Sequence, residues 1–262
     1  MKVSIIIPAY NEEKRIGKTL EEFGKFFQNL KKKKILDYEI LVVINNTTDN
    51  TPKIVKKYKK KYKEITYMNL RPGGKGFAII QGFKDALKRN NDLIGFVDAD
   101  MATHPKDFYE LSKHIDDYDG IIASRYVPGA IVKPKQSLNR IIASRIFNFL
   151  TRSLLFLNFR DTQCGAKIFR KDAILKIISK LNITKWAFDV NLLYVSKKSG
   201  LRIKEIATVW SDKEYSKINL RKSGSQMFFS IVRIRILNSP LKDFVRLYNK
   251  LPEKIKKMIR KL

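Results

Sequence analysis

Two carboxylates at the end of an apolar run are the residues in this chain best suited to chemistry. Asp98 and Asp100 are separated by one residue and follow the small or apolar residues 95–97. A buried parallel strand reads as a continuous apolar run, and open α/β sheets bind ligands at the carboxyl ends of their strands. Side chains alternate along an extended chain, so both carboxylates are expected on one side. Such a pair of oxygen ligands suits Mg²⁺ or Mn²⁺ bound to a diphosphate. The alternative is a strand that ends in a polar turn.

The cysteine and histidine residues do not indicate a second catalytic or metal-binding site. The chain has one cysteine, Cys164, which excludes an intrachain disulfide and a zinc cluster built on cysteines. The two histidines, His104 and His114, fall on the helix expected after Asp100. We interpret both as surface or packing residues.

Several cationic side chains have surroundings that suit a phosphate. The segment GGKG at 73–76 lacks the spacing and the following hydroxyl residue of a P-loop. Its glycines allow close backbone approach, so Lys75 is expected near a phosphate, with a plain tight turn as the alternative. Arg125 ends the apolar segment 120–124, and Arg140 and Ser144 are four residues apart in a helical pattern. Arginine suits phosphate because it binds in a bidentate way; the alternative is a solvated basic helix face.

The elements that must position these residues alternate between strand and helix over the first 125 residues. Apolar runs predict strands at 3–8, 38–44, 65–69, 93–98 and 120–124. Helical spacing fills the intervals, with Asn11 expected to cap the first helix and Pro52 to begin the second. This order predicts right-handed crossovers and an α/β fold with a mostly parallel central sheet and helices on both faces.

After residue 125 the alternation loosens. The pattern predicts a long helix at 136–157, an extended segment at 161–169, helices at 171–181 and 186–197, and a strand at 201–209. Residues 226–262 combine Phe, Leu and Ile with Arg and Lys, which is typical of amphipathic helices at a membrane surface. For the long helix the alternative is core packing, and for the basic C-terminal segment it is a dimer contact or a solvated helix.

Composition indicates a globular protein with an affinity for anions. The chain has 262 residues, 44% of them hydrophobic, and a formal net charge of +29. Such a charge attracts nucleic acid, anionic lipid or phosphorylated substrates. No apolar run reaches the roughly 18 residues of a transmembrane helix, and the first residues read as a strand and not as a signal peptide. We therefore expect a protein at the cytoplasmic face of a membrane, bound peripherally, without a transmembrane segment.

Three motifs narrow the function. The opening VSIIIPAYNEE at 3–13 resembles that of family 2 glycosyltransferases, and the pair Asp98 and Asp100 stands where that family binds its metal. The segments RDTQCGAKIF at 160–169 and WAFDV at 186–190 resemble the dolichyl-phosphate β-glucosyltransferase branch, next to dolichyl-phosphate mannose synthase. The resemblance covers residues 3–220. It divides the chain into a glycosyltransferase domain at 1–220 and basic membrane-associating helices at 221–262.

The resemblance implies a GT-A-type nucleotide-binding domain that transfers a hexose, with inversion, from a nucleotide sugar to dolichyl or polyprenyl phosphate. Asp98 and Asp100 are the implied catalytic residues and the ligands of Mg²⁺ or Mn²⁺. Around the nucleotide sugar, the implied residues are Pro8, Tyr10, Asn11, Glu12, Asn45, Lys75, Asp98, Ala99, Asp100 and Asp189. Around the acceptor phosphate, they are Arg125, Arg140, Ser144, Ser216 and Lys217. A phosphate monoester is mostly dianionic at neutral pH, so no general base is required.

Two positions depart from the family pattern. After the second strand the family has Asp-Asp-Gly-Ser, whereas this chain has INNTTD at 44–49. Asn45 therefore replaces a carboxylate, and an amide that both donates and accepts would pair with the base differently; a plain turn is the alternative. The mannose synthases also have a glutamine where this chain has Ala102. We expect weaker metal binding, with water completing the coordination.

Other functions remain open from the sequence. The donor sugar is glucose or N-acetylglucosamine from a UDP-sugar, with GDP-mannose as the alternative. A second alternative keeps the fold and uses an acceptor that is not a lipid. A third is a protein that binds nucleic acid or anionic membranes through its charge, which we disfavour because the chain has no nucleic-acid recognition module.

Overall fold

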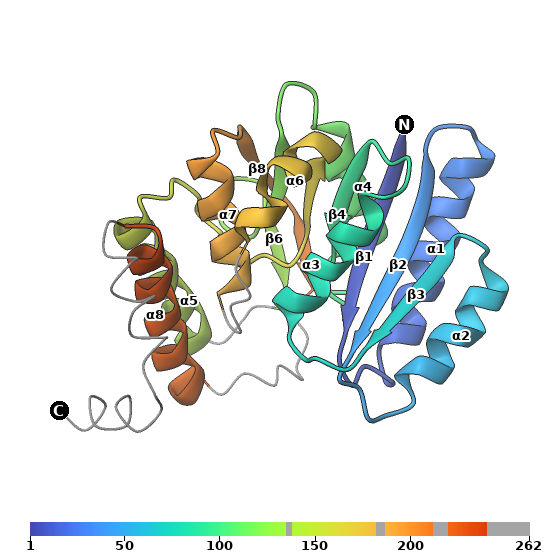
Figure 1. Cartoon of the computed structure of the whole chain (residues 1–262), viewed down its shortest axis with the longest axis horizontal. Coiled ribbons are helices and arrows are strands. Elements are labelled where there is room, and N and C mark those ends of the chain that lie inside the picture. The colour runs from blue at the N-terminus through green and yellow to red at the C-terminus, as the bar shows by residue number, and fades with distance from the viewer. Residues whose placement is uncertain (135–137, 182–186, 212–219, 240–262) are drawn as a thin grey trace.

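The computed structural model describes residues 1–134, 138–181, 187–211 and 220–239, with the backbone alone at 138–140, 220–227 and 237. Within them a seven-stranded sheet runs through the molecule in the order β3-β2-β1-β4-β7-β5-β8 (Figure 1). Its strands are β1 (Lys2–Ala9), β2 (Asp37–Asn45), β3 (Ile65–Leu70), β4 (Leu93–Phe96), β5 (Gly120–Ser124), β7 (Lys167–Arg170) and β8 (Ile203–Ala207).

Helices cover both faces of this sheet, as the alternation of strand and helix predicts. One face packs against α1 (Ile16–Lys32), α2 (Thr51–Lys61) and α4 (Pro105–Lys113). The other packs against α3 (Lys75–Ala86), α6 (Lys171–Ile177) and α7 (Phe188–Lys198), and a single 3-10 turn, η1 (Ile178–Lys180), follows α6. Along β1, Ile5 and Ile7 face the first group and Ile6 faces the second, because strand side chains alternate.

The expected mostly parallel sheet is confirmed. The position of one antiparallel strand, β7, was not predicted from the sequence. β7 lies antiparallel between β4 and β5, whereas the sequence predicted only an extended segment at 161–169 without a place in the sheet. Gly95 of β4 makes this possible, since a Cβ there would lie 2.6 Å from the carbonyl oxygen of Lys167. The fourth strand also ends earlier than predicted, at Phe96 and not at Asp98, because the chain turns within 98–102, where Met101 has a φ of 60°.

The connections of the sheet reverse direction between β1 and β4. The chain passes from β1 through α1 to β2 and β3 on one side, and from β4 through α4 to β5 on the other. The loops that follow β1 and β4 leave neighbouring parallel strands at their carboxyl ends, which is where open α/β sheets bind ligands. This topology places the turn that carries Asp98 and Asp100 beside the loop that begins at Tyr10.

A third hydrophobic cluster lies beyond β5. Here α5 (Leu138–Leu155) and α8 (Leu220–Leu237) pack beside α7, with Phe147, Leu193 and Ile231 buried among them. A small parallel ribbon of β6 (Ile131–Lys133) and β9 (Val209–Ser211), which we did not predict as a pair, packs Val132 and Trp210 against the cluster that contains α1 and α4. None of the described helices has the length and apolar character needed to cross a bilayer.

Candidate active site

The turn after β4 holds the two predicted carboxylates against the rest of the site. Asp98 and Asp100 are half-buried, whereas Ala99 between them is buried. Thr19 of α1 donates its hydroxyl to the Ala99 carbonyl at 2.7 Å, and Asp100 Oδ1 accepts the Ala102 backbone N–H at 3.0 Å. The turn is therefore fixed from both sides, and burial raises the pKa of Asp98.

Two lysines and Asp189 form an ionic cluster beside this turn. Lys75, at the start of α3, lies with its Nζ 2.6 Å from Asp98 Oδ1 and 3.5 Å from Asp189 Oδ2. Lys167 of β7 is fully buried and donates to Asp189 Oδ1 at 2.6 Å. Burial alone would raise the pKa of Asp189, but the charges of Lys167 and Lys75 outweigh burial and lower it. Asp189 is thus an ion-paired carboxylate and a weak base.

The side chain of Asn45 links the end of β1 to the glycine-rich loop. It is buried; its Nδ2 donates to the Ala9 carbonyl at 3.1 Å, and its Oδ1 accepts the Gly74 N–H at 3.0 Å. Gly74 has a φ of 124°, which favours glycine. Asn45 therefore joins the end of β1 to the glycine-rich loop. The sequence predicted a contact of Asn45 with the base and did not predict this structural role.

The loops after β1 and β2 are joined by hydrogen bonds. Asn11 was expected to cap α1, and this prediction is wrong: Asn11 has a φ of 51°, and its Oδ1 accepts the Thr48 N–H at 2.9 Å. The residue before α1 is Arg15, whose guanidinium pairs with Glu12 at 2.6 Å. Pro8 is half-buried and Tyr10 is 50% exposed, so Tyr10 is the aromatic ring that this loop offers to a ligand.

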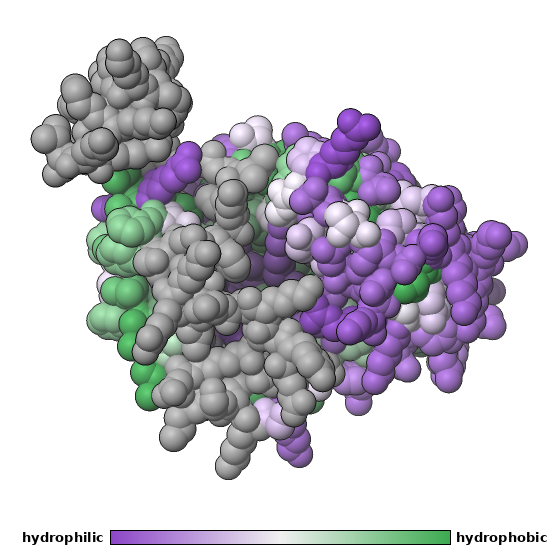
Figure 2. Space-filling model, turned by 90° about the horizontal axis from the view of Figure 1, so that it is seen from below, coloured by the Kyte–Doolittle hydropathy of each residue, from purple (hydrophilic) through white to green (hydrophobic). Residues whose placement is uncertain are grey.

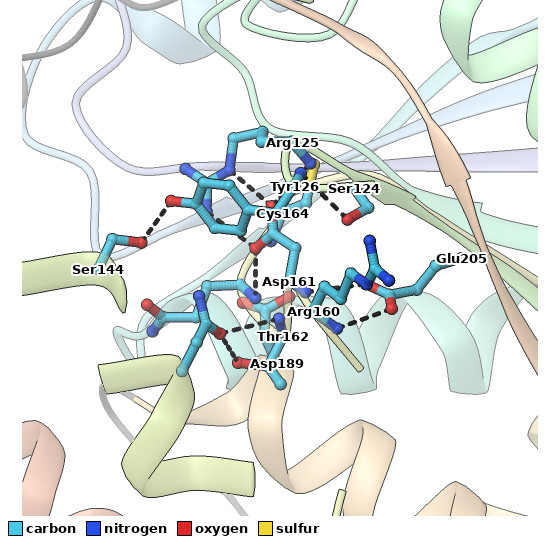
Figure 3. Close-up of polar contacts among 12 residues, drawn as sticks. Ser124, Arg125, Tyr126, Ser144, Arg160, Asp161, Thr162, Cys164, Asp189 and Glu205 are labelled. Carbon is cyan, nitrogen blue, oxygen red and sulfur yellow. Dashed lines mark hydrogen bonds and ion pairs between the residues drawn. The ribbon is translucent and has the colours of Figure 1, made fainter. Parts of the chain in front are cut away.

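Arg125 directly follows β5, and its side chain is only 12% exposed (Figure 3). Its Nε and Nη2 donate to the two oxygens of Asp161 at 2.7 Å and 2.9 Å, and its backbone N–H donates to Asp161 as well. The guanidinium also faces the rings of Tyr126 and Trp210, 5.3 Å and 5.1 Å from their centroids. Burial alone would lower the pKa of Arg125, but the charge of Asp161 raises it.

Ser144 of α5 reaches the same region through Tyr126. The two hydroxyls are 2.6 Å apart, and the guanidinium of Arg145 covers the Tyr126 ring at 4.3 Å. Arg140 lies one turn before Ser144 on α5, but its side chain lies outside the described residues, as do Trp186, Ser216 and Lys217. The structure therefore brings Arg125 and Ser144 together around Tyr126, and their binding of an acceptor phosphate stays a prediction.

A scan against protein-family models matches residues 4–178 to "Glycosyl transferase family 2". The chain belongs to glycosyl transferase family 2. The match includes the carboxylate pair, the glycine-rich loop, Arg125 and Asp161, so the elements that hold these residues are those of a family 2 glycosyltransferase. The expected family, activity class and GT-A-type fold are confirmed.

Curated relatives and solved structures agree with this assignment. The chain is 34% identical to dolichyl-phosphate beta-glucosyltransferase of Dictyostelium discoideum over 89% of the chain and 73% of the relative. It is 32% identical to the Homo sapiens enzyme of the same name, over 90% of the chain and 75% of the relative. Glucosyl-3-phosphoglycerate synthase from Mycobacterium tuberculosis, solved with Mn²⁺, UDP and glucosyl-3-phosphoglycerate, shares the fold (TM-score 0.62, 16% identity, 90% of this chain and 78% of that one).

Three residues around the site of this glycosyltransferase were not assigned roles from the sequence. Asp161 and Lys167 lie within the motif RDTQCGAKIF, and Trp210 lies one residue beyond the strand predicted at 201–209. A signal for Asp161 was present, since an arginine at the end of a buried strand needs a carboxylate partner. That partner is 36 residues away in sequence, and no local pattern selects it.

The donor set of this glycosyltransferase fits one divalent cation held together with a ligand. Among the residues that the structure describes, no three His, Cys, Asp or Glu side chains cluster as a complete metal site. Asp98 and Asp100 supply two carboxylates, and the ammonium of Lys75 already lies 2.6 Å from Asp98. Mg²⁺ is commonly bound by one or two carboxylates, with phosphates and water as the remaining ligands. The residues present therefore suit Mg²⁺ or Mn²⁺ with a diphosphate.

Proposed function

We propose that this enzyme transfers glucose from UDP-glucose to dolichyl or a related polyprenyl phosphate, with inversion at the anomeric carbon. This proposal depends on one observation. The structure has two half-buried carboxylates after β4 and, separately, an arginine after β5 that is held by a buried carboxylate. The first set suits a nucleotide diphosphate, and the second suits the phosphate of an acceptor. The relatives named dolichyl-phosphate beta-glucosyltransferase support the same pair of substrates.

The donor side uses Asp98, Asp100 and Lys75. A structural neighbour crystallised with UDP and Mn²⁺, and again with UDP and Mg²⁺, supports a divalent cation at this pair. Such a cation stabilises the negative charge that develops on the departing diphosphate. The ammonium of Lys75 lies beside Asp98 and would bind the diphosphate. The hydrogen bonds of the Ala99 carbonyl and the Asn45 side chain fix the backbone around the nucleotide.

The reaction requires no general base in the protein. An oxygen of the acceptor phosphate attacks the anomeric carbon, the bond from that carbon to the UDP oxygen breaks, and the electron pair leaves with UDP. The second pKa of a phosphate monoester is about 6, so the nucleophile is already mostly deprotonated at neutral pH. Asp189 is suited to a different role, because Lys167 and Lys75 hold its pKa low; it orients the lysines and contacts donor hydroxyls.

The acceptor side uses Arg125 and Ser144, joined by Arg140, Ser216 and Lys217 from outside the described side chains. Two of the five donors of Arg125 are used by Asp161. The remaining donors of a guanidinium held in this way are available for a phosphate, and the Arg125 side chain keeps 12% exposure. Arginine is suited to this task by its planar set of donors.

A lipid acceptor requires the enzyme to bind a membrane, and the outer side of α5 and α8 is suited to this. Ile142, Ile146 and Phe149 recur at spacings of four and three on α5 and are each more than half exposed. Phe229 of α8 is 68% exposed, and Arg145 and Arg152 are exposed on α5. Figure 2 shows hydrophobic residues gathered on the side of the molecule that α5 and α8 occupy in Figure 1.

This surface is the one that we propose binds peripherally to the cytoplasmic face of a membrane. Exposed Phe and Ile side chains enter the boundary of headgroups and acyl chains, and each basic residue near an anionic leaflet adds about 1 kcal/mol. Since Ser144 lies on the same helix as Ile142 and Ile146, α5 places the acceptor side of the site near the lipid. Residues 221–262 extend this basic, apolar segment in sequence.

A transfer assay tests the proposal. The full chain is incubated with vesicles that contain dolichyl phosphate and with labelled UDP-glucose, UDP-N-acetylglucosamine or GDP-mannose, in Mn²⁺, Mg²⁺ or EDTA. We expect label in the lipid phase from UDP-glucose alone, and none in EDTA. Product from GDP-mannose alone would replace the donor that we propose, and transfer to water-soluble acceptors alone would replace the acceptor.

A further inference from the structure

The segment from Asp161 to Lys167 contacts both halves of the site. It lies between α5 and β7 in the chain, and its first residue, Asp161, accepts the backbone N–H of Arg125. Its residues touch the arginine on the acceptor side and the first carboxylate on the donor side. Three contacts connect this segment to the two sides.

The first contact is the clamp on Arg125. Asp161 is fully buried, and its two oxygens accept the Arg125 side chain and the Arg125 backbone N–H (Figure 3). Asp161 Oδ1 also accepts the backbone N–H groups of Gln163 and Cys164, so the carboxylate is fixed by its own loop. The guanidinium of Arg125 therefore follows any movement of this loop.

The second contact is the close approach of Gly165 to Asp98. A Cβ on Gly165 would lie 1.9 Å from Asp98 Oδ2 and 2.5 Å from Asp98 Cγ. Every other amino acid at 165 would thus displace the Asp98 carboxylate. The displaced atoms are the end of a rotatable side chain, so the change moves the carboxylate while leaving the backbone of the fold in place.

The third contact is the buried ammonium of Lys167. It donates to the Cys164 carbonyl at 2.6 Å and to Asp189 Oδ1 at 2.6 Å. The second oxygen of Asp189 is 3.5 Å from Lys75, which in turn lies 2.6 Å from Asp98. Lys167 thus fixes the loop and completes an ionic path back to the same carboxylate that Gly165 limits.

We propose that the segment 161–167 sets the separation between the donor-binding carboxylate and the acceptor-binding arginine, with Asp161, Gly165 and Lys167 as positioning residues. This inference rests on the proposed function, which assigns the two sides to a donor and an acceptor. Displacement of a reacting group by about 1 Å can cost about 100-fold in rate. A single loop that contacts both groups fixes the distance between the anomeric carbon of the donor and the attacking phosphate of the acceptor.

The test on the donor side is Gly165→Ala. Its matched control is Gly17→Ala in α1, where a Cβ would make ordinary contacts of 3.5 Å or more. Titration calorimetry measures the dissociation constant of UDP with and without Mn²⁺, and thermal unfolding measures stability. We expect Gly165→Ala to reduce the Mn²⁺-dependent gain in UDP affinity at least tenfold with little change in Tm, and Gly17→Ala to keep that gain. An unchanged gain in Gly165→Ala would overturn the inference at this contact.

The test on the acceptor side is Asp161→Asn, measured below its own unfolding temperature. We expect the KM for dolichyl phosphate to rise at least tenfold, while UDP affinity in Mn²⁺ stays within twofold of the wild-type value. An unchanged acceptor KM, or an equal loss on both sides, would overturn the inference. UDP binding is read without turnover, so a wild-type protein that binds UDP but transfers no glucose to dolichyl phosphate would contradict the proposed function and leave the Gly165 result valid.

Discussion

Arg125 is held by a single buried carboxylate, and its charge has no other acidic partner among the described residues. An ion pair of this kind is costly to break, because removing one partner leaves the other charge buried and uncompensated. At the residue scale, the acceptor side therefore depends on Asp161 for both its shape and its stability.

Asp161→Asn is expected to lower the free energy of unfolding by about 3–5 kcal/mol at neutral pH. Burial alone would raise the pKa of Asp161, but Arg125 lowers it below the usual value of about 3.9. The ion pair therefore stabilises the fold fully above about pH 4, and this contribution is lost as the pH falls through the folded-state pKa. Denaturant unfolding from pH 7 to pH 2.5 should show this acid-side loss in the wild type and a shallower one in the variant. Parallel curves would contradict this role.

Asp100→Asn addresses the donor side. Replacing the charged carboxylate by a neutral carboxamide is expected to lower kcat by about 10²–10³. This is the loss typical when a group that stabilises developing charge is removed. The control is Asp117→Asn, an exposed position outside the site. If Asp100→Asn retained full, EDTA-sensitive transfer, the carboxylate pair would not be the metal site.

At the scale of the element, α5 has two different faces. Phe147, Thr151 and Leu155 are buried against the domain, whereas Ile142, Ile146 and Phe149 are exposed. Ser144 projects to Tyr126 from the same helix. One helix thus joins the core, the acceptor side and the surface that we propose to bind the membrane.

The double variant Ile146→Ser/Phe149→Ser is expected to weaken binding to anionic vesicles by roughly tenfold per residue, because each substitution removes part of the roughly 1.5–3 kcal/mol gained when such a side chain is buried. Flotation of vesicles measures the binding, and UDP affinity should not change. Leu175→Ser on α6 is the matched control, since Leu175 is 61% exposed on a different helix. Equal loss in both variants would argue against a membrane role of α5.

For the whole molecule, the charge and the apolar surface act together. The formal net charge is +29, and hydrophilic residues cover the side on which α1 and α2 lie (Figures 1 and 2). This charge brings the protein to an anionic surface from a distance that salt shortens. The apolar side of α5 and α8 then supplies the contact itself.

Binding to anionic vesicles should therefore fall steeply between about 0.05 M and 0.5 M salt, because the Debye length shortens from above about 10 Å to a few ångströms. Neutral vesicles are expected to bind more weakly and with little dependence on salt. Asp100→Asn should bind both as the wild type does. Binding that does not respond to salt would show that the charge has no part in attraction to the membrane.

The fold was largely predictable because its strands are local apolar runs and its helices have regular spacing. The place of the carboxylate pair just after a strand was predictable because the apolar run of β4 stops shortly before Asp98 and Asp100. The antiparallel place of β7, the pairing of Asp161 with Arg125 and the bonds of Asn45 depend on residues 29 or more positions apart. Such pairings arise from tertiary packing, so local periodicity does not reveal them.

The anomeric configuration of the lipid product tests the central claim most directly. UDP-glucose carries its glucose as the α-anomer, and direct attack by an acceptor phosphate inverts that centre. Proton NMR of the glucolipid made by the wild-type chain should give the large H1–H2 coupling of a β-glucosyl phosphate. An α-linked product, or a product whose glucose is not attached to the lipid phosphate, would contradict single-step transfer between the two sides of this site.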